Sequence, residues 1–304
     1  MFYKYNERKS YCFRKAERIM NVINKITAAY DKMSKSHKAI ARYVLENFDK
    51  AAYLNVEQLS QKTGVSEATV VRFSSELGYS KYQLFQKAVL DYAKSKLTNV
   101  QRMEAAYGRL SGTDIFEKVL NADMDKIRTT LSSHNAEIFN TALDIISGAR
   151  RIYIIGLRSS AALASFMGYY FNHIFEDVHI ISSSVGDVFD DIHNITKDDV
   201  LIGISFPRYS KRTINSLHYA KKMGASVIGL TDGALSPISS IADFTLTASS
   251  DMESFVDSLV APLSLVNAMI VALGARKKDE VSETFEKLEN LWREYEVYDN
   301  ADDK

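Results

Sequence analysis

The stretch IYIIGLRSSAALA, residues 152–164, decides the expected fold. It opens with an apolar run that ends at Gly156, which is typical of a parallel strand buried on both faces. A helix is expected from about Ser160. A buried strand that turns directly into a helix is the first half of a βαβ unit, so the sequence predicts an α/β sheet in this part of the chain.

Similar runs continue towards the C-terminus and alternate with helical segments. This spacing of strand, helix and strand predicts an open, doubly wound parallel sheet flanked by helices. The expected strands are IYIIG, VHIIS, VLIGIS, SVIGL and FTLT, with helices at about 160–175, 209–223 and 252–275. Two helices are expected before the sheet, near 113–131 and 135–148, and a charged amphipathic helix, KKDEVSETFEKLENLWREYEVY, after it.

The N-terminal third is expected to be all helical. Segments such as SKSHKAIARYVLENF place apolar residues three and four positions apart, so that Ile40, Val44 and Phe48 share a face. Ser34 or Ser36 is a suitable N-cap for this helix. The expected domains are a basic extension of unknown role at 1–19, a helical DNA-binding domain at 20–97, a linker at 98–112 and the α/β domain at 113–304.

The charges divide unevenly along the 304 residues. Residues 1–98 carry 18 Lys and Arg against 9 Asp and Glu, whereas the remainder carries 20 against 29. This asymmetry favours a polyanion-binding N-terminal domain, the alternative being chance clustering on two solvated surfaces. The single cysteine, Cys12, forms no internal disulfide and has no metal-ligand neighbours, which fits a reducing cytoplasm. No apolar run is long enough for a membrane span, and residues 1–19 lack the apolar centre of a signal peptide.

The segment VEQLSQKTGVSEATVVRF, residues 56–73, has the spacing of a helix-turn-helix. Gly64 provides the left-handed residue that a tight turn between two helices needs. Ser66 is a good N-cap for the second helix, and Val70 and Phe73 point back to the core. The alternative is an ordinary helical hairpin that binds no nucleic acid.

The second helix of this motif is expected to enter the major groove of DNA by its N-terminal end. Arg72 is suited to a bidentate contact with guanine or to a phosphate contact. Phosphate contacts supply most of the affinity of such an interface without reading sequence. The expected DNA-binding residues are Lys62, Ser66, Glu67, Thr69, Arg72, Lys81 and Tyr82.

Two hydroxyl-rich loops are expected at neighbouring strand ends of the sheet. The first follows Gly156 and offers Ser159 and Ser160 at a helix N-terminus, where free N–H groups and the helix dipole favour an anion. It is not a dinucleotide fingerprint, because Leu157 and Arg158 follow the glycine. The bland alternative is a plain turn from strand to helix.

The second loop lies in VLIGISFPRYSKRTI, residues 200–214. Ser205, Ser210 and Thr213 cluster around the start of a helix, with Arg208 and Lys211 nearby. Hydroxyls and backbone N–H groups recognise a phosphate and leave room for a sugar. The alternative is that Ser210 only caps the helix and Arg208 is a solvated surface charge.

These segments together carry a family resemblance. GLRSSAALA, DDVLIGISFPRYSKRT, AKKMGASVIGLTD and SSIADFTLT resemble a sugar isomerase (SIS) domain, the phosphosugar-binding α/β module. LSQKTGVSEATVVRFSSELGY resembles the N-terminal helix-turn-helix of the MurR/RpiR family of bacterial regulators. The resemblance implies a cytoplasmic regulator that binds operator DNA as a homodimer or homotetramer and senses a phosphorylated sugar.

By that resemblance, the ligand contacts are Ser159, Ser160, Ser205, Ser210 and Thr213. The sequence departs from many SIS domains where Leu157 and Arg158 replace a second glycine and a following serine. Arg208 likewise stands where small residues are frequent. Both arginines are therefore counted with the candidate ligand-binding residues.

An enzyme of this fold needs an acid–base pair. Glu253 is the best-placed acidic candidate in the sequence, and it is equally suited to bind a sugar hydroxyl. None of His173, His179, His193 and His218 lies in either serine loop, and His173 has the pattern of a packing residue. We therefore expect a receptor without cofactor or metal. The alternatives are a sugar-phosphate isomerase whose N-terminal helices dimerise it, and a DNA-binding protein with an empty SIS domain.

The expected mechanism links the two domains. Ligand binding orders the serine loops, shifts the packing of SIS domains in the oligomer and so changes the spacing of the paired DNA-binding helices. The helices from 83 to 148 are expected to carry this change. The segment Ser258 to Ala275 is apolar enough for the core or for a seam between subunits, and the sequence leaves both uses open.

Overall fold

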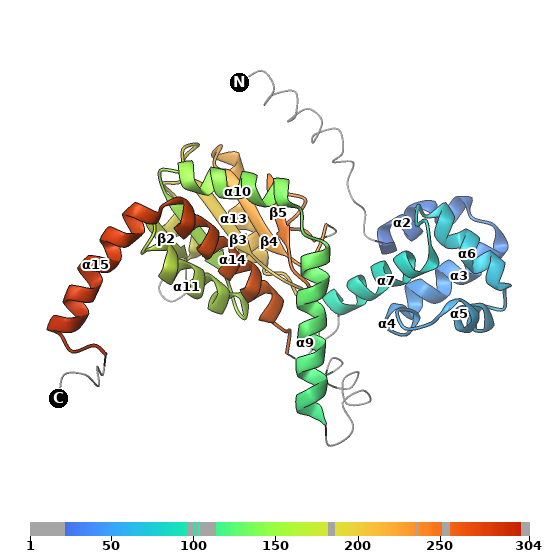
Figure 1. Ribbon diagram of the computed structural model, residues 1–304. Coiled ribbons are helices and arrows are strands. Elements are labelled where there is room, and N and C mark those ends of the chain that lie inside the picture. The colour runs from blue at the N-terminus through green and yellow to red at the C-terminus, as the bar shows by residue number, and fades with distance from the viewer. Residues whose placement is uncertain are drawn as a thin grey trace. The chain divides into compact units, whose positions relative to one another are not determined.

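The computed structural model describes residues 22–96, 100, 103, 114–181, 186–234, 236–250 and 256–298 (Figure 1). The chain forms two compact units, Met1–Ser111 and Gly112–Lys304. The extension at 1–19, most of the linker at 98–112, and Glu253 lie outside the described residues.

The N-terminal unit is helical throughout its described part, as the sequence predicts. Its buried core includes Ile40, Leu59 and Phe73. Ser34, rather than Ser36, caps α3, because its Oγ accepts a hydrogen bond from the His37 amide at 3.3 Å. The elements are α2 (Val22–Ala29), the short 3-10 helix η1 (Tyr30–Lys32), α3 (Lys35–Glu46), α4 (Phe48–Ala51), α5 (Val56–Thr63), α6 (Glu67–Glu76) and α7 (Tyr82–Lys96).

The second unit contains the predicted parallel sheet. Its order is β2-β1-β3-β4-β5, and every adjacent pair is parallel. The direction in which strands are added reverses between β1 and β3, so a crevice is expected at the carboxyl ends of these two strands. The strands are β1 (Ile152–Gly156), β2 (Val178–Ile181), β3 (Val200–Ile204), β4 (Ser226–Thr231) and β5 (Phe244–Thr247).

Helices cover both faces of this sheet, because successive residues of each strand point to opposite sides. Ile152 and Ile154 belong to one buried cluster, and Tyr153 and Ile155 to another. The first cluster includes α10 (Ala136–Gly148), α11 (Ser160–Phe171) and α14 (Val260–Arg276), and the second includes α12 (Val188–Ile192) and α13 (Lys211–Lys222) (Figure 1). The sequence did not predict α12.

Two further helices complete the unit. α9 (Ile115–Ser132) packs against α14, and α15 (Lys278–Glu294) is the expected charged C-terminal helix. One side of α14 is buried in the core through residues such as Val266 and Met269. On another side of the helix, Val271 is 63% exposed. In the described part of the chain, no single helix is long and apolar enough to cross a membrane; only α14 and α15 pass as a pair, bent by 99°.

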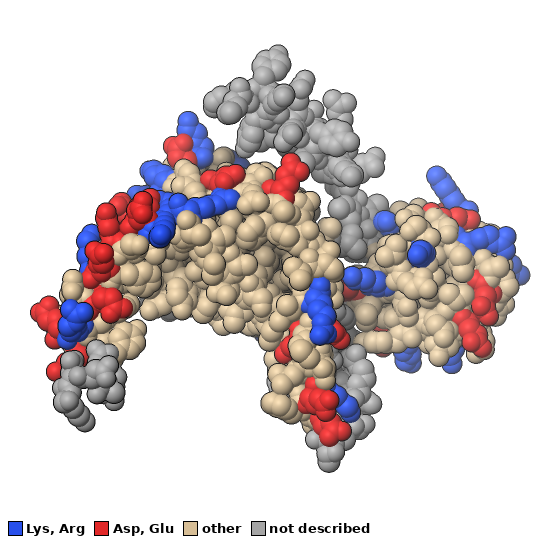
Figure 2. All heavy atoms as spheres, viewed as in Figure 1, with Lys and Arg blue, Asp and Glu red and all other residues tan. Residues whose placement is uncertain are grey.

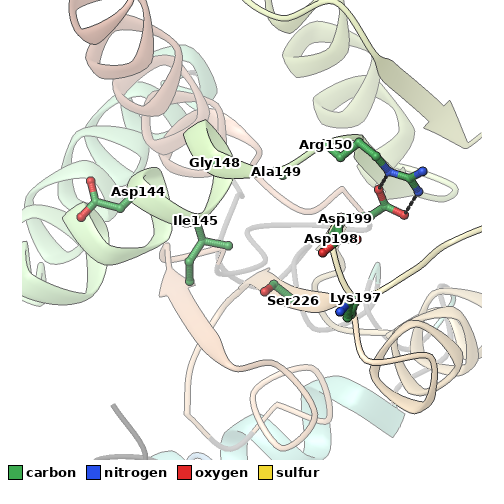
Figure 3. Close-up of a pocket in the computed structure, with 9 residues that line it drawn as sticks. All are labelled: Asp144, Ile145, Gly148, Ala149, Arg150, Lys197, Asp198, Asp199 and Ser226. Carbon is green, nitrogen blue, oxygen red and sulfur yellow. Dashed lines mark hydrogen bonds and ion pairs between the residues drawn. The ribbon is translucent and has the colours of Figure 1, made fainter. Parts of the chain in front are cut away.

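The amino ends of the strands are held by a buried carboxylate. Asp199 is fully buried and accepts hydrogen bonds from Arg150 Nε and Nη2 at 3.0 and 2.9 Å. It also accepts one from the Thr196 amide at 2.7 Å. Burial alone would raise the pKa of Asp199, but the hydrogen bonds from Arg150 and Thr196 outweigh it and hold this pKa below the usual range. Arg150 and Asp199 line the pocket in Figure 3, at the edge of the sheet opposite the serine loops.

Replacing this carboxylate tests its role in folding. We expect Asp199→Ala to lower the free energy of unfolding by about 2 kcal/mol, because it removes two hydrogen bonds from Arg150 and leaves the Thr196 amide without its partner. The exposed neighbour Asp198→Ala is the matched control and should change stability by less than about 0.5 kcal/mol. Urea unfolding measures both.

The same contact predicts a pH dependence. Because the pKa of Asp199 is depressed on folding, its contribution is complete above the unfolded pKa near about 4 and is lost as the pH falls below it. The parent should therefore lose more stability than Asp199→Ala between about pH 5 and pH 3. Parallel pH profiles for the two proteins would contradict this assignment.

Candidate functional site

The helix-turn-helix is shaped by three local signals. Asn55 and Gln58 form a capping box at the start of α5, with Gln58 N donating to Asn55 Oδ1 at 2.8 Å and Asn55 N donating to Gln58 Oε1 at 3.0 Å. Gly64 ends the helix in the left-handed conformation, at φ 67°. Ser66 then caps α6, its Oγ accepting from the Thr69 amide at 3.3 Å.

The second helix presents a defined outer face. Val70 and Phe73 are buried in the core, and His37 Nδ1 lies 3.0 Å from Glu76 Oε2, which ties the end of α6 to α3. Glu67 and Arg72 are exposed on the outer face, as sequence reasoning expects. Two further candidates, Lys62 and Lys81, are also exposed, at the end of α5 and just before α7.

Two of the candidate side chains on this motif make hydrogen bonds within α6 and its N-cap. Thr69 is half-buried, and its Oγ1 lies 2.9 Å from Ser66 Oγ. Arg72 Nε donates to the Ala68 carbonyl at 3.3 Å, which positions the guanidinium along the helix. Sequence reasoning missed Val71, which is 42% exposed beside Arg72 and is suited to contact a thymine methyl group.

Tyr82 requires a correction. The sequence placed it among the phosphate contacts, but it is 5% exposed and its hydroxyl donates to the Leu54 carbonyl at 2.7 Å. Burial raises the pKa of Tyr82 to about 12. Because its polar atom already has a partner inside the unit, Tyr82 is a packing residue and we remove it from the candidate DNA surface.

The strand register brings the serine loops to one edge of the second unit. Gly156 pairs with Ile204, and Ile204 pairs with Leu230, so β1, β3 and β4 end level with one another. Ser205 follows β3 directly, and its amide donates to the Leu230 carbonyl at 3.1 Å. The loops after these three strands therefore share the carboxyl edge of the sheet, as the βα spacing predicts.

The loop after β1 is tightly constrained. A Cβ on Gly156 would lie 2.5 Å from the Ser160 carbonyl oxygen, so only glycine fits the start of this turn. Arg158 adopts φ 59°, a left-handed conformation that non-glycine residues seldom take. The side chains of Arg158 and Ser159 are exposed, whereas Ser160 is buried at the first turn of α11.

The loop after β3 folds back onto the start of α13. Ser205 is 3% exposed, and its Oγ accepts a hydrogen bond from the Ser210 amide at 3.1 Å. Ser210 caps α13, its Oγ accepting from the Thr213 amide at 3.3 Å. Thr213 Oγ1 is buried and has no hydrogen-bond partner among the described residues. Arg208 and Lys211 are exposed beside this bend.

A third loop joins the same edge and was missed by sequence reasoning. Tyr209 Oη donates to Asp232 Oδ1 at 2.8 Å, which ties the loop after β3 to the end of β4. Thr231 Oγ1 lies 3.0 Å from the same carboxylate oxygen and 2.9 Å from Ser236 Oγ. The only sequence cue was the Thr-Asp-Gly that follows a predicted strand.

The histidines take positions away from the serine loops. His173 packs between Tyr169 of α11 and Phe285 of α15, at ring-centroid distances of 4.8 and 5.4 Å, and its Nδ1 has no hydrogen-bond partner among the described residues. His179 Nε2 lies 2.6 Å from Asp177 Oδ1 on the edge strand β2. Within the described ranges, no group of three or more His, Cys, Asp or Glu side chains could hold a metal ion.

Comparison with known proteins agrees with this architecture. Residues 20–96 match the helix-turn-helix domain of the rpiR family, and residues 145–272 match the SIS domain family. The chain belongs to the RpiR family of transcriptional regulators. The HTH-type transcriptional regulator HexR of Escherichia coli is 25% identical over 308 residues, covering 94% of this chain and 100% of its own.

Two solved structures share the fold of this RpiR-family chain. The sugar isomerase domain of an RpiR transcription factor from Sphaerobacter thermophilus superposes with a TM-score of 0.57 at 24% identity, covering 59% of this chain and 99% of its own. The Vibrio vulnificus NanR protein complexed with ManNAc-6P gives 0.54 at 22% identity, covering 89% and 99%. The helix-turn-helix and the regulator relatives favour a transcriptional regulator over the isomerase alternative.

The unpaired hydroxyl of Thr213 supplies a test of the site that needs no ligand. A buried donor without a partner costs about 1–3 kcal/mol, so Thr213→Val should leave the free energy of unfolding unchanged or raise it by about 1 kcal/mol. The matched control is Ser216→Ala on the same helix, which removes the hydrogen bond from Ser216 Oγ to the Arg212 carbonyl and should be destabilising. A loss of more than about 1 kcal/mol in Thr213→Val would show that this hydroxyl is satisfied within the protein.

Proposed function

We propose that this RpiR-family regulator binds operator DNA through α6 and that a phosphorylated sugar, bound at the carboxyl edge of the sheet, changes that binding. We take residues 20–97 as the DNA-binding domain and 113–304 as the effector domain. The observation that carries the proposal is the buried, unpaired Thr213 Oγ1 at the N-terminus of α13, beside Ser205 and Ser210.

The phosphate is proposed to lie at the start of α13. Free N–H groups and the helix dipole favour an anion at this position, and Thr213 has a hydroxyl available for it. Ser205 and Ser210 add hydroxyls, and the exposed Arg208 adds positive charge. Hydrogen bonds to an ionised group are stronger than neutral ones, so a phosphate would be held better here than an uncharged sugar.

The sugar would then extend towards the neighbouring loops. Ser159 and Ser160 provide hydroxyls on the β1 side, and Arg158 provides a cation there. Tyr209 and Asp232 provide a donor and an acceptor on the β4 side. In this proposal Glu253, in the segment between β5 and α14, binds a sugar hydroxyl rather than acting as a base. No cofactor or metal is needed for binding of this kind.

The DNA contacts are proposed to come from the outer face of the helix-turn-helix. Arg72 would contact guanine or a phosphate, and Glu67 would accept from a cytosine amino group. Ser66 and Thr69, near the N-terminus of α6, are placed for backbone phosphates, as are Lys62 and Lys81.

A homodimer or homotetramer in the cytoplasm fits this role. Two paired DNA-binding domains match the two half-sites of an operator, and the separation of these domains depends on how the effector domains pack. α11 carries no charged residue, and α14 carries only Arg276. The face of the α/β unit that these two helices form is therefore nearly free of charge (Figure 2). Charge depletion of this kind is typical of the centre of a protein interface.

A panel of hexose and hexonate phosphates tests the proposal. At least one member should raise the melting temperature of the full chain and change its affinity for a duplex that the parent selects from a random pool. No hit in the panel, or a hit without any effect on DNA affinity, would contradict it. Turnover of a panel member would favour the isomerase alternative.

Two sets of variants should separate the two sites. Arg72→Ala should lower affinity for the selected duplex by about 1–3 kcal/mol, measured by fluorescence anisotropy, and leave phosphosugar binding intact. Arg72→Lys keeps the charge but not the bidentate fork, so it distinguishes guanine contact from phosphate contact.

Ser205→Ala with Ser210→Ala should have the opposite pattern. Phosphosugar affinity, measured by calorimetry, should fall by roughly tenfold or more, because two hydrogen bonds to a charged group are lost. DNA affinity without ligand should stay within about twofold of the parent. Equal losses in both assays for either variant set would refute the assignment of separate sites.

A further inference from the structure

One face of helix α9 packs against its own α/β unit. Lys126 on this face is 4% exposed, and its Nζ lies 3.5 Å from Asp123 Oδ1. Ser258 Oγ donates to the same Asp123 oxygen at 2.6 Å, and Thr130 Oγ1 accepts from the Ser249 amide at 2.9 Å. These contacts join α9 to the segments on either side of residues 251–255, so the orientation of the helix about its axis is defined.

A second face of α9 carries an exposed apolar stripe. Its five members recur at intervals of four, four, three and four residues, which places them along one side of a helix. A contiguous exposed stripe of this length marks an interaction surface, whereas single exposed apolar residues are normal. The stripe consists of Phe116 (79% exposed), Leu120 (47%), Met124 (44%), Ile127 (38%) and Leu131 (73%).

The amino-terminal half of α9 extends beyond the layers of the α/β unit, and charged side chains gather near the ends of the helix in the space-filling view (Figures 1 and 2). The exposed large apolar residues of the N-terminal unit within the described ranges lie on different segments and form no matching stripe; they are Tyr53, Val71, Leu84 and Val100. An apolar stripe needs an apolar partner of similar length.

We propose that α9 pairs antiparallel with α9 of a second copy of this chain through this stripe. The spacing of the stripe is nearly symmetric about its middle. In an antiparallel pair, Phe116 meets Leu131 of the other copy, Leu120 meets Ile127, and Met124 lies near the twofold axis. The same patch is used by both copies, as a twofold interface requires.

The charges beside the stripe fit this arrangement. Glu117 and Arg128 are exposed and lie eleven residues apart, about three turns, on the same flank of the stripe. In an antiparallel pair of helices, equal flanks face each other, so Glu117 of each copy faces Arg128 of the other. Arg128 now contacts Asp125 at 2.7 Å, but both side chains are about 70% exposed, so this pair is weak and exchangeable.

The pairing would serve the proposed function, on which its biological meaning rests. α9 is the first described helix after the linker from the DNA-binding unit. An interface between two α9 helices, the α9 seam, would therefore define where the two linkers end. Asp123, held by Ser258, places this helix against the loop segments at the carboxyl edge of the sheet. A ligand at that edge would act on the seam through these contacts.

The mass of the full chain in solution gives the first test. Light scattering at about 20 µM should show the parent as a dimer or a higher even oligomer, and Leu120→Glu should lower it by one step, from dimer to monomer or from tetramer to dimer. Leu84→Glu, at 48% exposure against 47%, is the matched control and should keep the parent mass. Circular dichroism checks that both variants fold. A monomeric parent, or an unchanged mass in folded Leu120→Glu, overturns the proposal.

Charge reversal tests the antiparallel register. Glu117→Arg alone and Arg128→Glu alone each place like charges opposite each other and should raise the dissociation constant of the seam by about tenfold. The double variant restores both pairs and should return to within about threefold of the parent. A double variant no better than the singles overturns this register, including the case where another helix such as α15 covers the stripe.

Phosphosugar and DNA binding are measured on the same preparations. A monomeric parent that still binds phosphosugar contradicts the α9 seam and leaves the proposed function intact. A parent whose seam behaves as predicted but that binds no panel member contradicts the proposed function and leaves the seam intact.

Discussion

The hydrogen bond from the Ser210 amide to Ser205 Oγ, at 3.1 Å, is the contact on which the proposed effector site depends. It folds the chain after β3 back over the start of α13, so that Ser210 can cap the helix and Thr213 is buried beneath the bend. The cost of this geometry is a buried hydroxyl that finds no partner in the described chain. Native proteins leave few such groups, and those they leave are frequently functional.

The rest of the second unit serves to position this bend. The parallel register brings the ends of β1, β3 and β4 level, and the strand order reverses between β1 and β3, where a ligand-binding crevice is expected in folds of this kind. Arg158, in a left-handed conformation, lies in the loop after β1, and the contact from Tyr209 to Asp232 ties the loop after β3 to the end of β4. At the opposite edge, the Arg150–Asp199 pair secures the amino ends of the strands. Specific contacts therefore hold the chain at both edges of the sheet on which the proposed site lies.

Sequence patterns predicted the parts of this structure that follow from local chemistry. Apolar runs identified the five strands, although only β1, β3 and β4 are buried along most of their length, and Gly64 and Ser66 identified the turn of the DNA-binding motif. What sequence missed depends on distant neighbours. The sequence pattern predicts that Tyr82 is a surface residue. Its hydroxyl instead donates to the Leu54 carbonyl, 28 residues away in the chain. The Tyr209–Asp232 contact, five-residue α12 and the choice of packing face on α9 are likewise decided by tertiary contacts.

In the proposed regulator, phosphosugar binding is coupled to DNA binding, and thermodynamics makes that coupling reciprocal. The most direct measurement is a paired titration of the full chain with a panel hit: the affinity for the selected duplex with and without saturating phosphosugar, and the affinity for phosphosugar with and without saturating duplex. The account predicts the same factor in both directions, of about 5 to 150. A factor of one in both titrations would contradict it.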